Sequence, residues 1–279
     1  MMNRESIPIK LSVIMSVYDK EEPLYLERAL YSIWNEQFLK PDQIVLVKNG
    51  PLTIDLDNIL KKWANLIPGI LLIINLEENL GFARALNIAL AASKGDYIAR
   101  MDTDDISTSD RFAKQVTFLK TNKTIDVVGT QISEINEHEN IIKDIVKYPT
   151  NHEDLLNFFS RRDPIAHPSA MFRYSFFKKA GIYSESHPLF EDTYLWFLGF
   201  KSGCKFSNID SVCLKYRRSK SFYKRRGDGA KAVRLLRVRL FKINRELNFN
   251  FLSDVYAILY FIMSLLPSKI KKIAYQYFR

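Results

Sequence analysis

Short apolar runs alternate with helically patterned segments over the first hundred residues, and this alternation constrains the fold most. The first run, Leu11–Val17, carries no charged residue, as expected of a strand buried on both faces. Residues 21–37 then place Leu26, Leu30 and Ile33 at helical spacing. Further strands are expected at 44–47, 70–74 and 97–99, with helices at 55–66 and 82–92 between them. The alternation predicts an α/β fold with a mixed, mainly parallel sheet and helices on both faces.

The second half of the chain shows a less regular pattern but no repeats and no low-complexity linker. Helices are expected over 110–121, 151–161 and 174–180 and from 191 onward, with extended segments over 127–147 and a strand at 212–217. Because no linker interrupts the chain, we expect one domain over 1–227. Residues 228–279 would then form basic and apolar C-terminal helices.

Composition narrows the class of protein. With 47% hydrophobic residues among 279, the chain can bury a substantial core. Cys204 and Cys213 form no CxxC pair, which indicates reduced core thiols, and the four histidines lack paired metal-binding spacing. The first ten residues lack the apolar core of a signal peptide. These features predict a cytoplasmic protein.

The net charge of +10 is unevenly distributed along the chain. Residues 211–279 hold 17 Lys and Arg against three acidic residues, whereas residues 1–210 hold 24 against 28. A mildly acidic body with a strongly basic tail predicts that the tail meets an anionic partner. Substrate phosphates, a membrane surface and nucleic acid are the candidates.

An acidic tetrapeptide, Asp102-Thr103-Asp104-Asp105, follows the fourth apolar run. A polar turn that caps the next helix is the simplest explanation. However, three carboxylates at the end of a buried strand repel each other unless a divalent cation lies among them, and oxygen ligands suit Mg²⁺ or Mn²⁺. Parallel sheets bind ligands at the carboxyl ends of their strands, where this tetrapeptide is expected.

Two other motifs could carry chemistry. Gly81 permits a tight turn into a helix whose first turn holds Arg84, a combination suited to diphosphate, although an Arg beside a glycine turn is as a rule only solvated. Glu191 and Asp192 open an apolar helix. They either complement the helix dipole or supply a base that takes a proton from an attacking hydroxyl.

The ordered set of motifs resembles the inverting glycosyltransferases of family 2, which have a GT-A fold. It is similar in particular to bacterial enzymes of exopolysaccharide, O-antigen and capsule assembly, of the amylovoran-biosynthesis type. The resemblance extends from about Lys10 to about Gly227. The motifs are VIMSVYDKE, VLVKNGP, NLGFARALN, GDYIARMDTDDIS, Arg111 with Gln115, HPSAMFR, FEDTYLW and YRRS.

The resemblance implies roles for individual residues. On the donor side, the candidates for nucleotide and donor binding are Ser16, Tyr18, Asn49, Arg84, Asp102, Thr103 and Arg225. Asp102 and Asp104 match the DxD motif, and they would hold an Mn²⁺ or Mg²⁺ cofactor that bridges the donor diphosphate, with Asp104 as the more direct ligand. Asp192 matches the general base, and Glu191 would help to orient the acceptor or the base.

One position departs from the pattern of the family. Many relatives carry an acidic pair after the second strand, where this chain has Lys48-Asn49. Asn49 can still hydrogen-bond a pyrimidine, whereas the Lys48 side chain cannot accept a hydrogen bond. A UDP-sugar remains the favoured donor, with other nucleotides open.

The basic tail admits two interpretations at each of its segments. Residues 216–227, which include Arg225, could close over the donor diphosphate as in the resembling enzymes, or form a solvated loop. The 17 mainly apolar residues of 251–267 are short for a membrane span, which needs roughly 20. They favour a helix that lies in the interface of an anionic membrane, and the alternative is a helix pair packed on the domain.

The leading hypothesis is a metal-dependent transferase that moves sugar from a nucleotide-diphospho-sugar to a lipid-linked saccharide acceptor. It would work at the inner face of the cell membrane as a peripheral protein. One alternative is a non-catalytic nucleotide-sugar-binding subunit. A basic nucleic-acid-binding protein is the other, but it leaves the carboxylate motifs unexplained, so no nucleic acid partner is expected.

Overall fold

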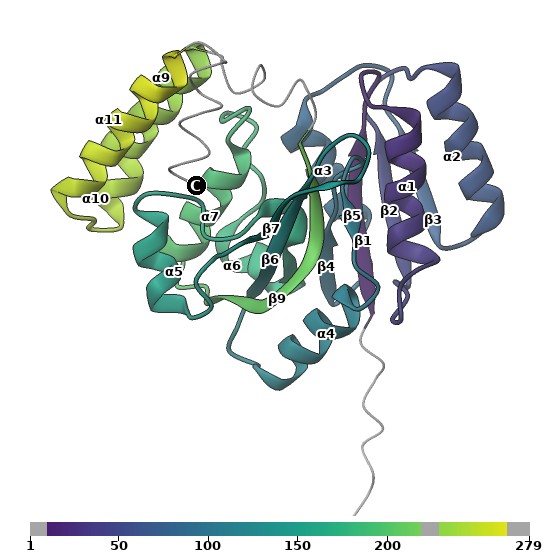
Figure 1. Cartoon of the computed structure of the whole chain (residues 1–279), viewed down its shortest axis with the longest axis horizontal. Helices are drawn as coiled ribbons and strands as arrows, with labels where there is room; N and C mark the ends of the chain where they lie inside the picture. The colour runs from purple at the N-terminus through teal and green to yellow at the C-terminus, as the bar shows by residue number, and fades with distance from the viewer. Residues whose placement is uncertain (1–9, 219–228, 267–279) are drawn as a thin grey trace, which may run out of the picture.

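The computed structural model describes residues 10–218 and 229–266 (Figure 1). Its strands are β1 (Leu11–Val17), β2 (Gln43–Lys48), β3 (Leu71–Asn75), β4 (Tyr97–Arg100), β5 (Ile106–Ser107), β6 (Val127–Ile135), β7 (Ile141–Val146), β8 (Met171–Arg173) and β9 (Phe206–Arg217). Within the described residues they form one sheet in the order β3-β2-β1-β4-β8-β6-β9-β5, with β7 paired to β6.

Helices follow the strands as the sequence pattern predicts. They are α1 (Pro23–Trp34), α2 (Ile54–Leu66), α3 (Phe82–Ala92), α4 (Arg111–Thr121), α5 (His152–Phe159), α6 (Tyr174–Ala180), α7 (Glu191–Lys201), α9 (Gly229–Val238), α10 (Asn244–Glu246) and α11 (Phe251–Leu265), with a 3₁₀ turn η1 (His167–Ser169) and a π-helix η2 (Arg239–Ile243). The predicted alternation of strands and helices over the first hundred residues is confirmed.

The four strands of the N-terminal half are parallel, whereas the rest of the sheet is mixed. β1 pairs in parallel with β2 and β4, and β2 pairs in parallel with β3. Beyond β4, the three-residue strand β8 runs antiparallel to both β4 and β6. β6 and β9 then pair in parallel over most of their length. The strand pairing therefore changes from parallel to mixed at β8. This strand is too short for the sequence pattern to reveal.

Helices cover both faces of the sheet and create two hydrophobic cores. On one face, α1, α2 and α4 pack Leu30, Trp63 and Phe112 against the strands. On the other face, α3, α5, α6 and α7 form an aromatic-rich core that contains Phe172 and Trp196. Successive central residues of β1 and β2, such as Val13 and Ile14 or Ile44 and Val45, enter opposite cores, which is why the central parts of these strands are apolar.

Helix α4 fixes the end of β4 through a buried arginine. Arg111 donates from Nη2 to the Arg100 carbonyl at 2.8 Å and from Nε to Gln115 Oε1 at 3.1 Å. Gln115 in turn donates to the carbonyls of Val128 and Ser169. Complete burial lowers the pKa of Arg111 to about 10. The Arg111–Gln115 motif is therefore part of the frame that positions the C-terminal end of β4.

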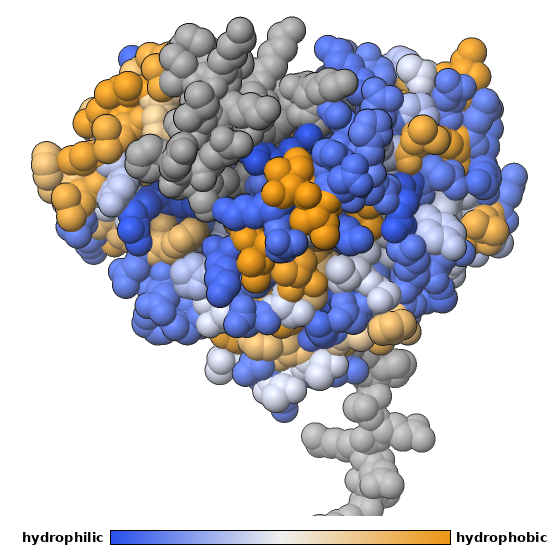
Figure 2. Space-filling model, in the orientation of Figure 1, coloured by the Kyte–Doolittle hydropathy of each residue, from blue (hydrophilic) through white to orange (hydrophobic). Residues whose placement is uncertain are grey.

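The C-terminal helices lie against α5 and α7 at one end of the molecule (Figure 1). Ile243 of η2 is fully buried in the aromatic-rich core. Helix α11 packs on α9 and leaves an apolar face exposed, visible at the upper left of Figure 2. Its exposed apolar side chains include Phe251, Leu252, Leu259, Ile262 and Leu265. Among the described residues, no helix is both long and apolar enough to cross a bilayer.

A glycine turn after β2 brings two loops into close contact, and a pair of substitutions tests it. Gly50 has φ +90°, and a Cβ there would lie 2.9 Å from the backbone N of Asn79. Gly69 has φ +78°, but a Cβ added at Gly69 would have no heavy atom within 4 Å. We expect Gly50→Ala to cost about 2–3 kcal/mol of unfolding free energy and Gly69→Ala about 1 kcal/mol, since only the former adds a clash to the backbone strain.

Chemical denaturation of the two variants measures this difference. Equal losses for Gly50→Ala and Gly69→Ala would show that the contact with Asn79 is unimportant.

Candidate active site

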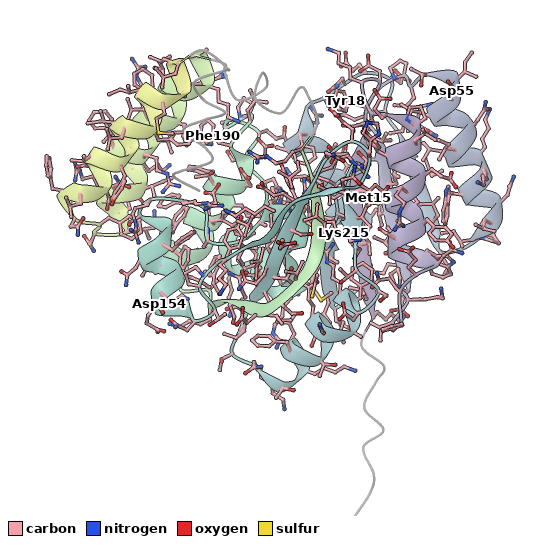
Figure 3. The ribbon with its side chains drawn as sticks, in the orientation of Figure 1. Met15, Tyr18, Asp55, Asp154, Phe190 and Lys215 are labelled. Carbon is pink, nitrogen blue, oxygen red and sulfur yellow. The ribbon has the colours of Figure 1, made fainter. Side chains whose placement is uncertain are left out.

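The carboxyl ends of β1, β2 and β4 meet at one edge of the sheet. Val17 of β1 lies opposite Lys48 of β2, and Ile14 lies opposite Arg100 of β4. Figure 3 shows Tyr18 just beyond the end of β1 and Phe190, which precedes α7, toward the same upper edge of the molecule. The predicted motifs on these strands therefore come together, as expected for ligand sites in parallel sheets.

The acidic loop, residues 102–105, gathers its three carboxylates. Oxygens of Asp102, Asp104 and Asp105 all lie within 4.8 Å of one another. Asp105 is fully buried, and its Oδ2 has no hydrogen-bond partner among the described residues. Burial, together with the charges of Asp104 and Asp102, raises the pKa of Asp105 well above its usual range. An unpartnered buried oxygen beside two other carboxylates fits a hard divalent cation, whose charge would offset both the repulsion and the burial.

Arg100 pairs with Asp102 from beneath the acidic loop. The Arg100 side chain is only 4% exposed, and its guanidinium lies 5.3 Å from the centre of the Phe82 ring. A buried guanidinium attracts the carboxylate that it contacts. Arg100 therefore fixes the position of Asp102, and both Asp102 and Asp104 remain partly exposed.

Arg217, at the end of β9, holds the acidic loop from the other side. Its backbone N–H donates to Asp105 Oδ1 at 2.8 Å, and its Nε donates to the Asp104 carbonyl at 2.7 Å. The guanidinium also donates to the carbonyls of Asn136 and Glu137 and lies 4.1 Å from the centre of the Tyr25 ring. Sequence reasoning missed this role, although YRRS was noted as a motif.

The donor-side candidates differ in how free their side chains are. Asn49 is 5% exposed, and its amide donates to Asn79 Oδ1 and accepts from the Leu80 N–H. Asn49 therefore shapes the turn before α3. Lys48 forms an ion pair with Asp57 at 2.6 Å. Arg84 is exposed on the first turn of α3 and makes no ion pair with another described residue.

The remaining donor-side candidates lie near the acidic loop or outside the described ranges. Ser16 and Tyr18 are partly exposed at the end of β1, and Thr103 is 4% exposed within the acidic loop. Arg225 lies outside the described residues.

Glu191 and Asp192 lie on the first turn of α7. Glu191 is 8% exposed, and its Oε2 has no hydrogen-bond partner among the described residues. Burial and the neighbouring Asp192 charge raise the pKa of Glu191 to about 7. Asp192 is partly exposed, and its Oδ1 accepts the Thr193 N–H at 2.8 Å. Glu191 thus supplies a buried carboxyl with a pKa of about 7, and Asp192 supplies a more accessible carboxyl beside it.

One buried tyrosine links the acidic loop with the start of α7. Burial raises the pKa of Tyr183, and the charges of Asp192, Glu191 and Asp102 act in the same direction. The Tyr183 hydroxyl lies 2.9 Å from His167 Nε2. Ring contacts connect the same two regions, since the Arg100 guanidinium lies 5.3 Å from the centre of the Phe82 ring and Phe82 packs on His167 at 6.4 Å between centres. His167 in turn packs on Trp196 of α7 at 5.8 Å. The site therefore has acidic groups from two motifs about 90 residues apart in the sequence.

The sheet and the two carboxylate motifs define an α/β protein of the GT-A class. The family model described as "Glycosyl transferase family 2" matches residues 12–181, more than half of the chain. The chain belongs to this family, as the sequence motifs predicted.

Several curated proteins are similar over most of the chain. "Amylovoran biosynthesis glycosyltransferase AmsE" of Erwinia amylovora is 36% identical over 77% of this chain and 79% of its own length. "UDP-Gal:alpha-D-GlcNAc-diphosphoundecaprenol beta-1,3-galactosyltransferase" of Escherichia coli is 31% identical over 78% of each chain. An uncharacterized glycosyltransferase of Haemophilus influenzae is 34% identical over 97% of this chain and 99% of its own.

Solved structures share the fold at lower identity. S. aureus TarS matches with a TM-score of 0.63 and 19% identity, over 89% of this chain and 44% of that longer one. TarS 1-349 in complex with UDP-GlcNAc matches with a TM-score of 0.61 and 18% identity, over 92% of this chain and 82% of that chain. This likeness confirms the predicted fold class.

Because the pKa of Glu191 is raised, replacing this residue by a neutral one should increase the unfolding free energy in a pH-dependent way. A carboxyl whose pKa rises on folding binds more protons in the folded state than in the unfolded state. Glu191 therefore lowers the unfolding free energy increasingly as the pH rises from about 4.5 through about 7. We expect Glu191→Gln to raise the unfolding free energy by about 2–3 kcal/mol at pH 8 and to change it little at pH 5.

Denaturant titrations at pH 5 and pH 8 measure the gain. A gain of the same size at both values would contradict the assigned origin of the shift.

Proposed function

We propose that the protein is an inverting glycosyltransferase that moves a sugar from a nucleotide-diphospho-sugar to a lipid-linked saccharide acceptor. A UDP-sugar is the favoured donor, and the product belongs to bacterial surface polysaccharide. The observation that carries the proposal is the gathering of three carboxylates in the acidic loop, with a second carboxylate pair, Glu191-Asp192, on the first turn of α7.

On the donor side, the acidic loop would hold the cofactor, Mn²⁺ or Mg²⁺, through Asp104 and Asp102. When bound, the ion neutralises charge on the departing diphosphate. Arg100 pairs with Asp102, and Arg217 holds the Asp105 carboxylate and the Asp104 carbonyl in place. Arg84, exposed at the start of α3, is suited to a donor phosphate. Ser16 and Tyr18 remain the proposed contacts of the nucleoside.

On the acceptor side, we assign Asp192 as the general base. It would take the proton from the acceptor hydroxyl while that oxygen attacks the anomeric carbon and the bond from this carbon to the diphosphate oxygen breaks. One displacement inverts the anomeric centre and requires no covalent intermediate on the protein. A positioned base contributes roughly 10²–10⁴-fold to such a rate. Glu191, with a pKa of about 7, lies beside Asp192 and helps to orient it or the acceptor.

The choice of substrates is supported by the relatives. One similar protein is named as a galactosyltransferase that uses UDP-Gal and a GlcNAc-diphosphoundecaprenol acceptor, and TarS binds UDP-GlcNAc. Asn49 uses one N–H and one oxygen lone pair in the turn at Asn79. Its second N–H and second lone pair stay available to a nucleobase, and the end of β1 is the other proposed contact. We propose a hexosyl or N-acetylhexosaminyl donor.

A lipid-linked acceptor fits a protein that rests on an anionic membrane. Helix α11 exposes Leu252 by 61%, Leu259 by 50% and Ile262 by 51%. Residues 211–279 hold 17 Lys and Arg against three acidic residues. An apolar face with flanking cations is suited to the interface of a bilayer that contains anionic lipid. We therefore propose two functional parts, a transferase domain over 1–227 and a membrane-facing segment over 228–279.

A panel of nucleotide sugars tests the donor and the metal role together. We expect one donor, with UDP-Gal, UDP-Glc and UDP-GlcNAc tried first, to raise the melting temperature in the presence of Mn²⁺, since ligand binding stabilises the folded state. Asp104→Ala should abolish the metal-dependent part of this shift and lower transfer at least 100-fold. Asp104→Ala that transfers normally without metal would contradict the metal assignment.

Asp192→Asn serves as the matched variant on the acceptor side. It should keep the donor-induced thermal shift yet lose transfer to a GlcNAc-diphospho-lipid by about 10²–10⁴-fold. Unchanged transfer would remove Asp192 as the base, and a donor-binding wild-type protein without any transfer would favour a non-catalytic subunit.

Membrane binding can be tested on the exposed face of α11. We expect Leu259→Asp with Ile262→Asp to weaken sedimentation with phosphatidylglycerol-containing vesicles at least tenfold, because two apolar side chains would no longer enter the interface. The matched control is Leu24→Asp with Ile54→Asp, which changes residues of α1 and α2 that are 80% and 78% exposed. Equal partitioning of both double variants would exclude α11 as the membrane contact.

A further inference from the structure

A buried arginine from the C-terminal helices reaches the loop beside the proposed base. Arg239, in the π-helix η2, donates from Nη1 to the Phe159 carbonyl at 2.6 Å. Its Nη2 lies 3.4 Å from Asp163 Oδ1, and its guanidinium lies 4.5 Å from the centre of the Phe159 ring. Only 9% of Arg239 is exposed. A π-helix is rare, and single turns of this kind are frequent at functional sites.

Asp163 connects this arginine to the first turn of α7. Both of its carboxylate oxygens accept from the Thr193 hydroxyl, at 2.9 and 3.0 Å. The backbone N–H of Thr193 donates to Asp192 Oδ1 at 2.8 Å. A continuous series of polar contacts therefore runs from Arg239 through Asp163 and Thr193 to Asp192.

The charges along this series balance one another. Partial burial and the nearby Asp192 charge raise the pKa of Asp163 to about 6, while Arg239, the Thr193 hydroxyl and Arg162 act in the opposite direction. Without Arg239, two carboxylates would repel each other at the start of α7. The arginine therefore permits Asp163 to bind Thr193 as an anion close to Asp192.

A second contact from the same helices holds the loop that leads into α7. Lys242 Nζ lies 2.6 Å from the Tyr194 hydroxyl. The Tyr194 ring stacks on His187 at 3.7 Å between centres. A hydrogen bond of 2.6 Å joins His187 Nδ1 to the Ser184 hydroxyl. Leu189 in this loop has φ +72°, an unfavourable conformation for a non-glycine residue. The C-terminal helices thus contact the chain on both sides of Asp192.

We propose that Asp163 and Arg239 are positioning residues for Asp192, so that the C-terminal helices form part of the catalytic apparatus as well as a membrane-facing surface. This inference rests on the proposed function. The contacts cluster at the N-terminal end of α7, next to the base. At the opposite end of the same helix, Lys201 pairs with Glu246 of α10 at 2.5 Å on a half-exposed surface.

The ion pair at the far end of α7 supplies a matched control. Both pairs join the C-terminal helices to the transferase domain, but Lys201 is nine residues beyond Asp192, about 13 Å along a helix. The variants Asp163→Asn, Arg239→Met and Thr193→Val are compared with Lys201→Met in the full-length protein. Transfer to a GlcNAc-diphospho-lipid is measured with the donor found in the panel.

We expect the three positioning variants to lower kcat about 10- to 100-fold, because small displacements of a base are costly, while the donor KM and the donor-induced thermal shift stay unchanged. Arg239→Lys should restore part of kcat, and Lys201→Met should leave it unchanged. Arg239→Met removes a positive charge close to the proposed base and should move the acidic limb of the kcat profile to higher pH, whereas Lys201→Met should leave the limb in place.

Values of kcat within twofold of the wild type in all three variants would overturn the inference. A loss of kcat that parallels a loss of thermal stability, with no movement of the pH profile in Arg239→Met and no rescue in Arg239→Lys, would also overturn it, since a purely structural role predicts that result. Wild-type protein that transfers no sugar would instead overturn the proposed function, so the two failures are distinguishable.

Discussion

The repulsion among the three carboxylates of the acidic loop is the constraint on which the site depends. The loop itself holds no basic residue, and the nearest one, Arg100, lies two residues before it and pairs with Asp102. The fold brings a second cation from the distant strand β9, where Arg217 bonds the Asp105 carboxylate and the Asp104 carbonyl. Asp105 nevertheless stays buried with a raised pKa, which is the electrostatic condition that a divalent cation would relieve.

The sequence predicts the first half of the fold because its signals are local. Runs such as Leu11–Val17 and helices such as Ile54–Leu66 show their periodicity within a single window. The pattern could not reveal β8 or β5, which have three and two residues, because such short strands have no measurable period. Their existence depends on pairing with β4, β6 and β9, which is a property of the folded chain.

The residues of the candidate site also fall into those that the local sequence reveals and those that it does not. The sequence singles out Asp104 and Asp192 as candidates because each lies in a short family motif beside another acidic residue. Arg217 and Asp163 could not be predicted, since each acts through a partner far away in sequence, and an isolated Arg or Asp is ordinary at a protein surface. Asn49 shows a further limit of the sequence, because the bonds of its side chain to Asn79 and Leu80 depend on a loop about 30 residues away and are not visible in the motif.

The bond from the Arg217 N–H to Asp105 spans 112 residues, and this separation bears on how the protein is made. During synthesis the acidic loop leaves the ribosome long before β9 exists, so the nascent chain carries its carboxylates without the strand that holds them. β9 must also pair with β6 along most of its length before Arg217 is in place. Non-local pairing of this kind forms late and slowly. A partly synthesised chain therefore lacks the arranged acidic loop, which is complete only when β9 has joined the sheet.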